Sequence, residues 1–175
     1  DGLTRHEGER LIAQTLRPPA PSEASPRPPA ESLGRFLPNM RAVGSWPVPE
    51  LIARVREKRA RMERALAPAA AIAARLRPQD REFFENNLLA QARILTGLLA
   101  WTESVALAHQ ARERDPEAAA ANLQRALEAF AGIRAGQALA SRGAWKDWYR
   151  GDKKMNLNRA ERQTREALAL LTRER

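Results

Sequence analysis

A chain of 175 residues with 43% hydrophobic side chains is long enough to bury one core, which favours a single domain. It has no cysteine, which excludes disulfides and thiolate metal sites, and its apolar runs are shorter than the ~20 residues that a membrane span requires. The net charge of +9 raises the question of nucleic-acid binding, while an aromatic share of only 5% predicts a core of Leu, Ala and Ile.

The N-terminal part predicts little regular structure. Residues 1–16 fit a short amphipathic helix, weakened by Gly2 and Gly8, or the end of a preceding element. The apolar side of this helix would be formed by Leu3, Leu11, Ile12 and Leu16. Residues 17–48 form a Pro-rich linker followed by an irregular segment that we expect to cover the helices. A plain spacer is favoured over a docking motif for the Pro-rich part.

Two long helices are predicted next. The first opens at Pro49 and continues to Leu76, with Pro68 expected to kink it or split it in two. The second opens at Pro78 and runs to Arg114. Apolar residues recur along both at helical spacing. The expected buried stripes are Leu51, Ile52, Val55, Met62, Leu66, Ile72 and Leu76 in the first, and Phe83, Leu88, Ile94, Leu95, Leu98, Trp101, Val105 and Ala108 in the second.

Capping signals mark two further helices. Asp115 followed by Pro116 predicts a third helix start, and this helix is expected to end near Gly143. Asn158 with Glu161 three residues later resembles a capping box for the last helix. The expected buried side chains are Leu123, Leu127, Phe130, Ile133 and Leu139 in the third helix, and Ala167, Leu168 and Leu171 in the last.

No stretch alternates with a period of two residues, so no sheet is predicted. The expected fold is an all-α, up-and-down bundle of four main helices over residues 49–175, preceded by the irregular Pro-rich segment.

One segment differs in composition from the helices. Residues 143–157 hold two of the four tryptophans, the only tyrosine and three of the four lysines, although Arg outnumbers Lys 26 to 4 in the whole chain. The candidate ligand-binding residues are Trp145, Trp148, Tyr149, Arg150, Asp152, Lys154 and Asn156.

Flat rings beside charged and amide groups suit a sugar, whose apolar face packs on indole while its hydroxyls form hydrogen bonds. The same side chains suit stacking of a nucleobase or the grip of a phosphate or carboxylate. The alternative is architectural, with the indoles closing one end of the bundle.

No other motif predicts chemistry. Asp80, Glu82 and Glu85 suit the positive end of a helix, and His6 and His109 are isolated in the sequence. We therefore predict no catalytic residue, metal site or cofactor in this chain. The Arg150-Gly151-Asp152 tripeptide is expected by chance in a chain so rich in arginine.

The positive charge is local. Residues 141–165 carry eight basic and three acidic side chains, a net charge of +5, whereas Arg alternates with Glu and Gln along the first two helices. This distribution favours a local site for an anion or polar ligand and disfavours a stripe that follows nucleic-acid phosphates.

The long Ala/Leu/Arg helices followed by the pattern Gly143-x-Trp145-x-x-Trp148-Tyr149-Arg150-Gly151-Asp152-x-Lys154-x-Asn156 resemble the helical region after the catalytic barrel of some bacterial glycoside hydrolases. Those enzymes include α-glucuronidase-like and hexosaminidase-like types. The resemblance covers roughly Pro49–Arg175. It implies a bundle that buttresses the barrel, with one loop able to reach the substrate cleft.

The same resemblance implies that residues 1–16 end a preceding catalytic domain and that the parent protein is secreted or periplasmic. The pair of carboxylates that such hydrolysis needs has no candidate here, so catalysis would belong to another part of that parent.

Three functions are expected in order of preference. The first is a non-catalytic accessory domain of a carbohydrate-active enzyme, which contacts the preceding catalytic domain and a carbohydrate. The second is a basic helical module that binds nucleic acid or an acidic protein. The third is a self-associating bundle without a ligand.

Overall fold

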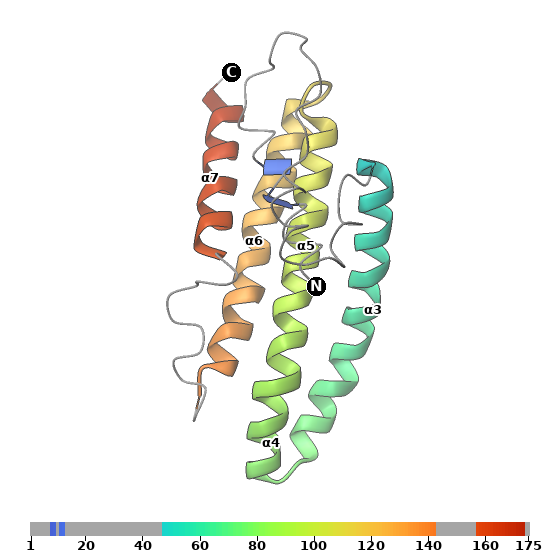
Figure 1. Cartoon of the computed structure of the whole chain (residues 1–175), viewed down its shortest axis with the longest axis vertical. Helices are drawn as coiled ribbons and strands as arrows, with labels where there is room; N and C mark the ends of the chain where they lie inside the picture. Colours follow the sequence, from blue (N-terminus) through green and yellow to red (C-terminus); the bar gives the residue numbers. More distant parts are fainter. Residues whose placement is uncertain (1–7, 10, 13–46, 143–156, 174–175) are drawn as a thin grey trace, which may run out of the picture.

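The computed structural model describes residues 8–9, 11–12, 47–142 and 157–173, and all regular structure in this part of the chain is helical (Figure 1). The elements are α3 (Val48–Arg75), α4 (Pro78–Phe84), a π-helical turn η2 (Glu85–Leu89), α5 (Ala90–Ala111), α6 (Pro116–Ala140) and α7 (Leu157–Arg173). The chain is therefore an all-α helical bundle, as its sequence predicts.

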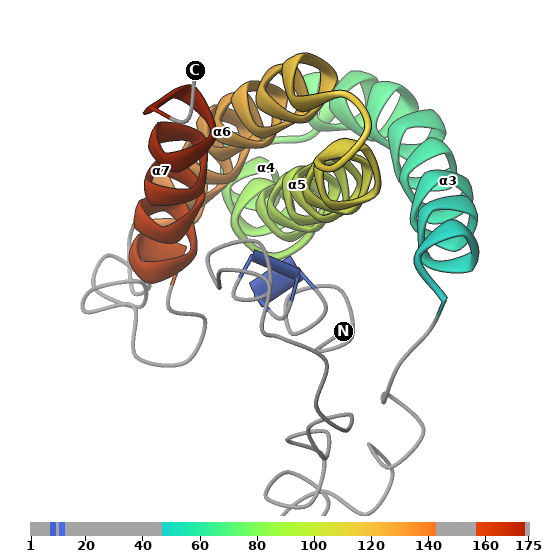
Figure 2. The same cartoon turned by 90° about the horizontal axis from the view of Figure 1, so that it is seen from above.

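The pair α5 and α6 forms the centre of the bundle. The two helices are joined by a short turn and run antiparallel, with α3 against α5 and α7 against α6 (Figures 1 and 2). The turn ends at Asp115, whose Oδ1 accepts a hydrogen bond of 2.8 Å from the amide of Ala118. This confirms the predicted cap and the helix start at Pro116.

Small residues bring α5 and α6 close together. A Cβ built on Gly136 would lie 2.8 Å from Cγ1 of Ile94 and 3.0 Å from the carbonyl oxygen of Ala90. A Cβ on Gly97 would lie 2.5 Å from Cγ1 of Ile133. Any larger residue at either glycine would push the helices apart.

Trp101 lies at the centre of the core. It is fully buried, and its ring meets Phe130 of α6 edge-on, with the ring centroids 6.1 Å apart. Its indole nitrogen donates a hydrogen bond of 3.1 Å to Oγ1 of Thr164 on α7. One side chain of α5 therefore links three helices and has its only polar group satisfied.

The N-terminal segment packs against this core. Leu11 and Ile12 are helical and fully buried in the same hydrophobic cluster. At Gly8, a Cβ would lie 2.3 Å from the six-membered ring of Trp101, so only glycine fits against the indole there. The glycine expected to weaken this helix is therefore required for its packing.

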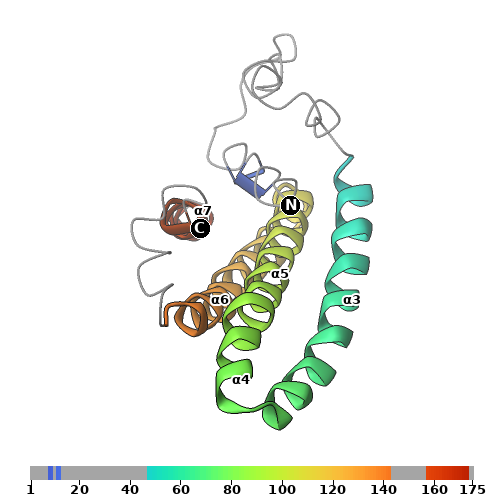
Figure 3. The ribbon, with the colours of Figure 1, turned by 60° about the horizontal axis from the view of Figure 1, so that its bottom comes forward.

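Pro68 does not split the first helix. The helix α3 is continuous from Val48 to Arg75, and its ribbon curves toward α4 (Figure 3). Curvature is the expected response to a proline that removes one hydrogen bond and crowds the preceding turn. The helix begins one residue before Pro49, which occupies a first-turn position as predicted.

Three residues of the predicted stripes are exposed, which corrects the sequence expectation. Phe83, Leu88 and Ile72 are 69%, 55% and 51% exposed. The π-helical turn η2 places one extra residue in a turn, so Phe83 before it and Leu88 within it do not continue the apolar stripe of α5. Ala73 is buried on the side of α3 that faces the bundle, and its neighbour Ile72 is not on that side.

The rest of the predicted core is largely confirmed. Ile94, Leu98, Val105, Leu123, Phe130, Ile133 and Ala167 are buried, and Met62, Leu168 and Leu171 pack against the cluster.

Candidate functional site

The seven candidate binding residues lie outside the described residues. They are Trp145, Trp148, Tyr149, Arg150, Asp152, Lys154 and Asn156. The described residues that flank their segment are Arg142, after the end of α6, and Leu157, at the start of α7.

The chain enters this segment from a fixed position beside η2. Ser141 ends α6, with its hydroxyl donating a hydrogen bond of 2.7 Å to the carbonyl oxygen of Gln137. Nη1 of Arg142 then lies 3.7 Å from Oε2 of Glu85 on η2. The last described residues before the aromatic segment therefore follow a capped helix end, and Arg142 makes a long, partly exposed ion pair with η2.

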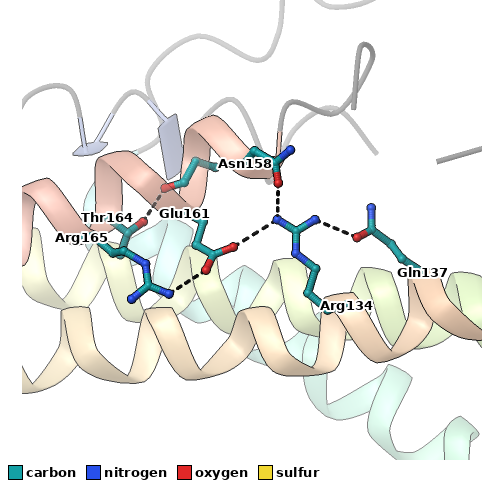
Figure 4. A network of polar contacts seen from close by, with 7 residues as sticks. Arg134, Gln137, Asn158, Glu161, Thr164 and Arg165 are labelled. Atoms are coloured by element: carbon teal, nitrogen blue, oxygen red, sulfur yellow. Dashed lines mark hydrogen bonds and ion pairs between the residues drawn. The ribbon is translucent and has the colours of Figure 1, made fainter. Parts of the chain in front are cut away.

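The chain leaves the segment at an equally fixed position. Leu157 is fully buried in the core, and Arg134 of α6 holds the next turn of α7 (Figure 4). Nη2 of Arg134 donates hydrogen bonds of 2.6 Å to Oδ1 of Asn158 and 3.1 Å to Oε2 of Glu161. The carboxylate of Glu161 also accepts a hydrogen bond of 2.8 Å from Arg165.

These contacts correct the predicted capping box. Asn158 lies inside α7, and its side-chain oxygen and the carboxylate of Glu161 both turn to Arg134 on the neighbouring helix. The hydrogen bond from Arg165, followed by the hydrogen bond and charge of Arg134, outweighs burial and holds the pKa of Glu161 below its ordinary value of 4.5.

The two anchors are close together in the chain at the C-terminal end of α6. Arg134 lies inside this helix, and Arg142 directly follows Ser141, at which the helix ends. Both ends of the aromatic segment are thus tied to the C-terminal part of α6 and its neighbours. A segment anchored in this way is supported by rigid elements, which is what a binding loop requires.

A second polar cluster joins α3 to α5. The side chain of Glu103 is only 6% exposed, and its Oε1 accepts a hydrogen bond of 2.9 Å from Nε of Arg56. Nη1 of Arg59 lies 3.0 Å from Oε2, in ion-pair contact without hydrogen-bond alignment. Sequence reasoning missed this cluster, although a single carboxylate inside the apolar part of α5 is a detectable signal.

Two of the other acidic candidates, Asp80 and Glu85, contact arginines. Asp80 accepts a hydrogen bond of 2.7 Å from Arg77, and Glu85 is paired with Arg142.

Within the described ranges, no three His, Cys, Asp or Glu side chains come together in a group that could hold a metal ion. None of the described helices is long and apolar enough to cross a membrane.

The fold and these contacts define the chain as an all-α helical bundle in which cross-helix ion pairs hold both flanks of an aromatic segment. Comparison with protein-family models, with curated proteins and with solved structures finds no match to this chain. Function is therefore inferred from the residues and their geometry.

Proposed function

We propose that this chain is a non-catalytic helical accessory domain of a larger, glycoside hydrolase-like enzyme. In this proposal the bundle buttresses the catalytic domain that precedes it in the parent protein, and residues 143–156 contact carbohydrate. A parent of this kind is bacterial and is secreted or periplasmic.

The observation that carries the proposal is the fixation of both flanks of the aromatic segment. Arg142 pairs with Glu85 on one side, and Arg134 binds Asn158 and Glu161 on the other. Such anchoring reduces the entropy that a binding loop loses when it takes up a ligand. The polar side chains at the flanks bind other parts of the bundle. In this proposal, residues 143–156 themselves recognise the carbohydrate.

The composition of the segment favours carbohydrate. Trp145, Trp148 and Tyr149 offer rings for stacking on a sugar face, and Arg150, Asp152, Lys154 and Asn156 offer donors and acceptors for hydroxyl groups.

The test is binding of polysaccharides by the chain itself. We expect soluble plant and bacterial polysaccharides, screened by affinity electrophoresis, to include at least one that retards the chain. The double variant Trp145→Ala/Trp148→Ala should bind that polysaccharide about thirtyfold more weakly, because stacking on each of the two rings contributes on the order of 1 kcal/mol. Trp46→Ala is the matched control, since it removes an indole outside the segment.

Two results contradict the proposal. The first is equal retardation of the double variant and the unaltered chain. The second is loss of helical circular dichroism in the double variant, which shows that the indoles close the end of the bundle and act in folding.

A further inference from the structure

The outer side of α3 packs against none of the other described helices. Between Val55 and Ala73 no residue of α3 is buried. The half-buried residues of this stretch, which face the bundle, include Met62 and Leu66. In Figures 2 and 3 α3 stands at the edge of the bundle, with α5 on one side only.

The exposed side of this helix carries an ordered pattern. We define the outer row of α3 as Arg61, Arg64, Pro68, Ile72 and Arg75, all of which are exposed. Their spacings of three, four, four and three residues make each one the surface neighbour of the next. The row lies opposite the half-buried residues, because neighbours such as Arg64 and Leu66 are about 200° apart around the helix.

The row combines free cations with an apolar centre. Arg61 is paired with Glu57 at 2.9 Å, whereas Arg64 and Arg75 form no ion pair with any described residue. Ile72 is 51% exposed between them. Pro68 has no amide hydrogen, so the carbonyl of Arg64 lacks its usual helical donor and adds an acceptor at the same place.

The end of the row is held rigidly by the hairpin with α4. Arg81 donates hydrogen bonds of 2.9 Å to the carbonyl oxygen of Ala73 and 2.8 Å to that of Ala74. These bonds satisfy carbonyl groups at the C-terminal end of α3 and fix its position relative to α4. The surface near Ile72 is thus preformed.

We propose that the outer row of α3 binds a protein surface in which carboxylates surround an apolar patch. Charge complementarity supports this partner, since α3 carries seven basic and three acidic side chains. Exposed aliphatic surface beside guanidinium groups suits an interface with an apolar centre and a polar rim.

Two other occupants fit less well. A second copy of the chain would bring like-charged rows together, at a net charge of +9 per chain. Nucleic acid prefers an unbroken cationic stripe, whereas Pro68 and Ile72 separate the cations of this row, and an apolar side chain makes no favourable contact with phosphate. The outer row contains no residue of the aromatic segment, so this inference stands apart from carbohydrate binding.

The experiment measures binding of defined polyanions by fluorescence anisotropy at low and high salt. The probes are labelled poly(Glu,Tyr) copolymer, poly-glutamate and single-stranded RNA of similar length. We expect poly(Glu,Tyr) to bind more tightly than poly-glutamate, because tyrosine supplies the apolar contact. Arg64→Glu should weaken binding of poly(Glu,Tyr) about fivefold, and Ile72→Ala about threefold with no change for poly-glutamate.

Arg93→Glu is the matched control, because it makes the same change in net charge at an exposed position of α5. Equal weakening by Arg93→Glu and Arg64→Glu overturns the proposal and shows attraction by net charge alone. Poly(Glu,Tyr) binding no better than poly-glutamate also overturns it. Tighter binding of RNA that is lost in Arg64→Glu identifies a nucleic-acid surface instead. Circular dichroism of each variant confirms that the helices are retained.

Discussion

At the scale of single residues, the buried side chain of Glu103 on α5 is joined to α3 by two arginines. Its carboxylate is almost fully buried and is held by Arg56 and Arg59, which are themselves partly exposed. A buried carboxylate is costly without partners, so this contact fixes how α3 docks on α5.

Removing this charge should therefore destabilise the fold. We expect Glu103→Gln to lower the free energy of unfolding by about 1–2 kcal/mol, less than for a fully buried pair because both arginines can turn to water. The control Glu57→Gln removes an exposed pair with Arg61 and should cost under about 0.5 kcal/mol. Urea denaturation measures both, and equal values would show that burial of Glu103 contributes nothing.

Glu161 makes stability depend on pH. Its folded pKa lies below the ordinary value of 4.5 because of the hydrogen bond from Arg165 and the contacts of Arg134. A carboxylate with a lowered folded pKa stabilises the fold at neutral pH, and this contribution is lost as pH falls through the folded pKa.

We accordingly expect the Tm of the unaltered chain to fall more steeply below pH 4.5 than that of Glu161→Gln. At neutral pH the variant should lose about 1 kcal/mol, since one charge-assisted contact is weakened. Glu128→Gln, at an exposed position of α6, is the control and should keep the acid-dependent slope. Parallel slopes for all three proteins would contradict the role of Glu161.

At the scale of elements, the contact between α5 and α6 depends on the absence of side chains at two glycines. Gly136 faces the backbone of α5, whereas a Cβ on Gly132, one turn earlier in α6, would meet nothing within 4 Å. The same substitution in the same helix should thus have opposite effects at these two positions.

Gly136→Ala should lower the free energy of unfolding by about 1–3 kcal/mol, because the added methyl group meets Ile94 and a backbone carbonyl. Gly132→Ala should raise it by about 0.5–1 kcal/mol through the lower helix propensity of glycine. Thermal denaturation of the pair provides the measurement. A stabilised Gly136→Ala variant would mean that α5 and α6 do not approach this closely.

At the scale of the whole molecule, residues distant in sequence complete one core. Leu11 and Ile12 lie in the same hydrophobic cluster as Trp101 and Phe130, although 34 residues of the Pro-rich and irregular segment separate them from residue 47. The N-terminal segment should thus unfold together with the helices.

We expect Leu11→Ala to lower stability by about 2–4 kcal/mol in a single transition, as for other fully buried leucines. Leu170→Ala is the control, because that side chain is 40% exposed and should cost under about 1 kcal/mol. Near-ultraviolet circular dichroism of the indoles follows the transition. An unchanged midpoint for Leu11→Ala would separate the N-terminal segment from the core.

Local patterns in the sequence determined the helical class, the starts of α4 and α6 and most of the buried residues. Capping and proline signals act within a few residues, so Asp115 and Pro78 suffice to place these starts. The unusual composition of residues 143–156 is likewise a property of the sequence alone.

Only the tertiary structure decided which partners the polar groups and glycines meet. The contacts of Glu103 with α3, of Arg134 with α7 and of Gly8 with Trp101 join residues far apart in the chain. The π-helical turn that follows the exposed Phe83 likewise has no signal in hydrophobic periodicity. Periodicity shows which side of a helix is apolar, whereas the packing of neighbouring helices determines how much of that side is covered and by what.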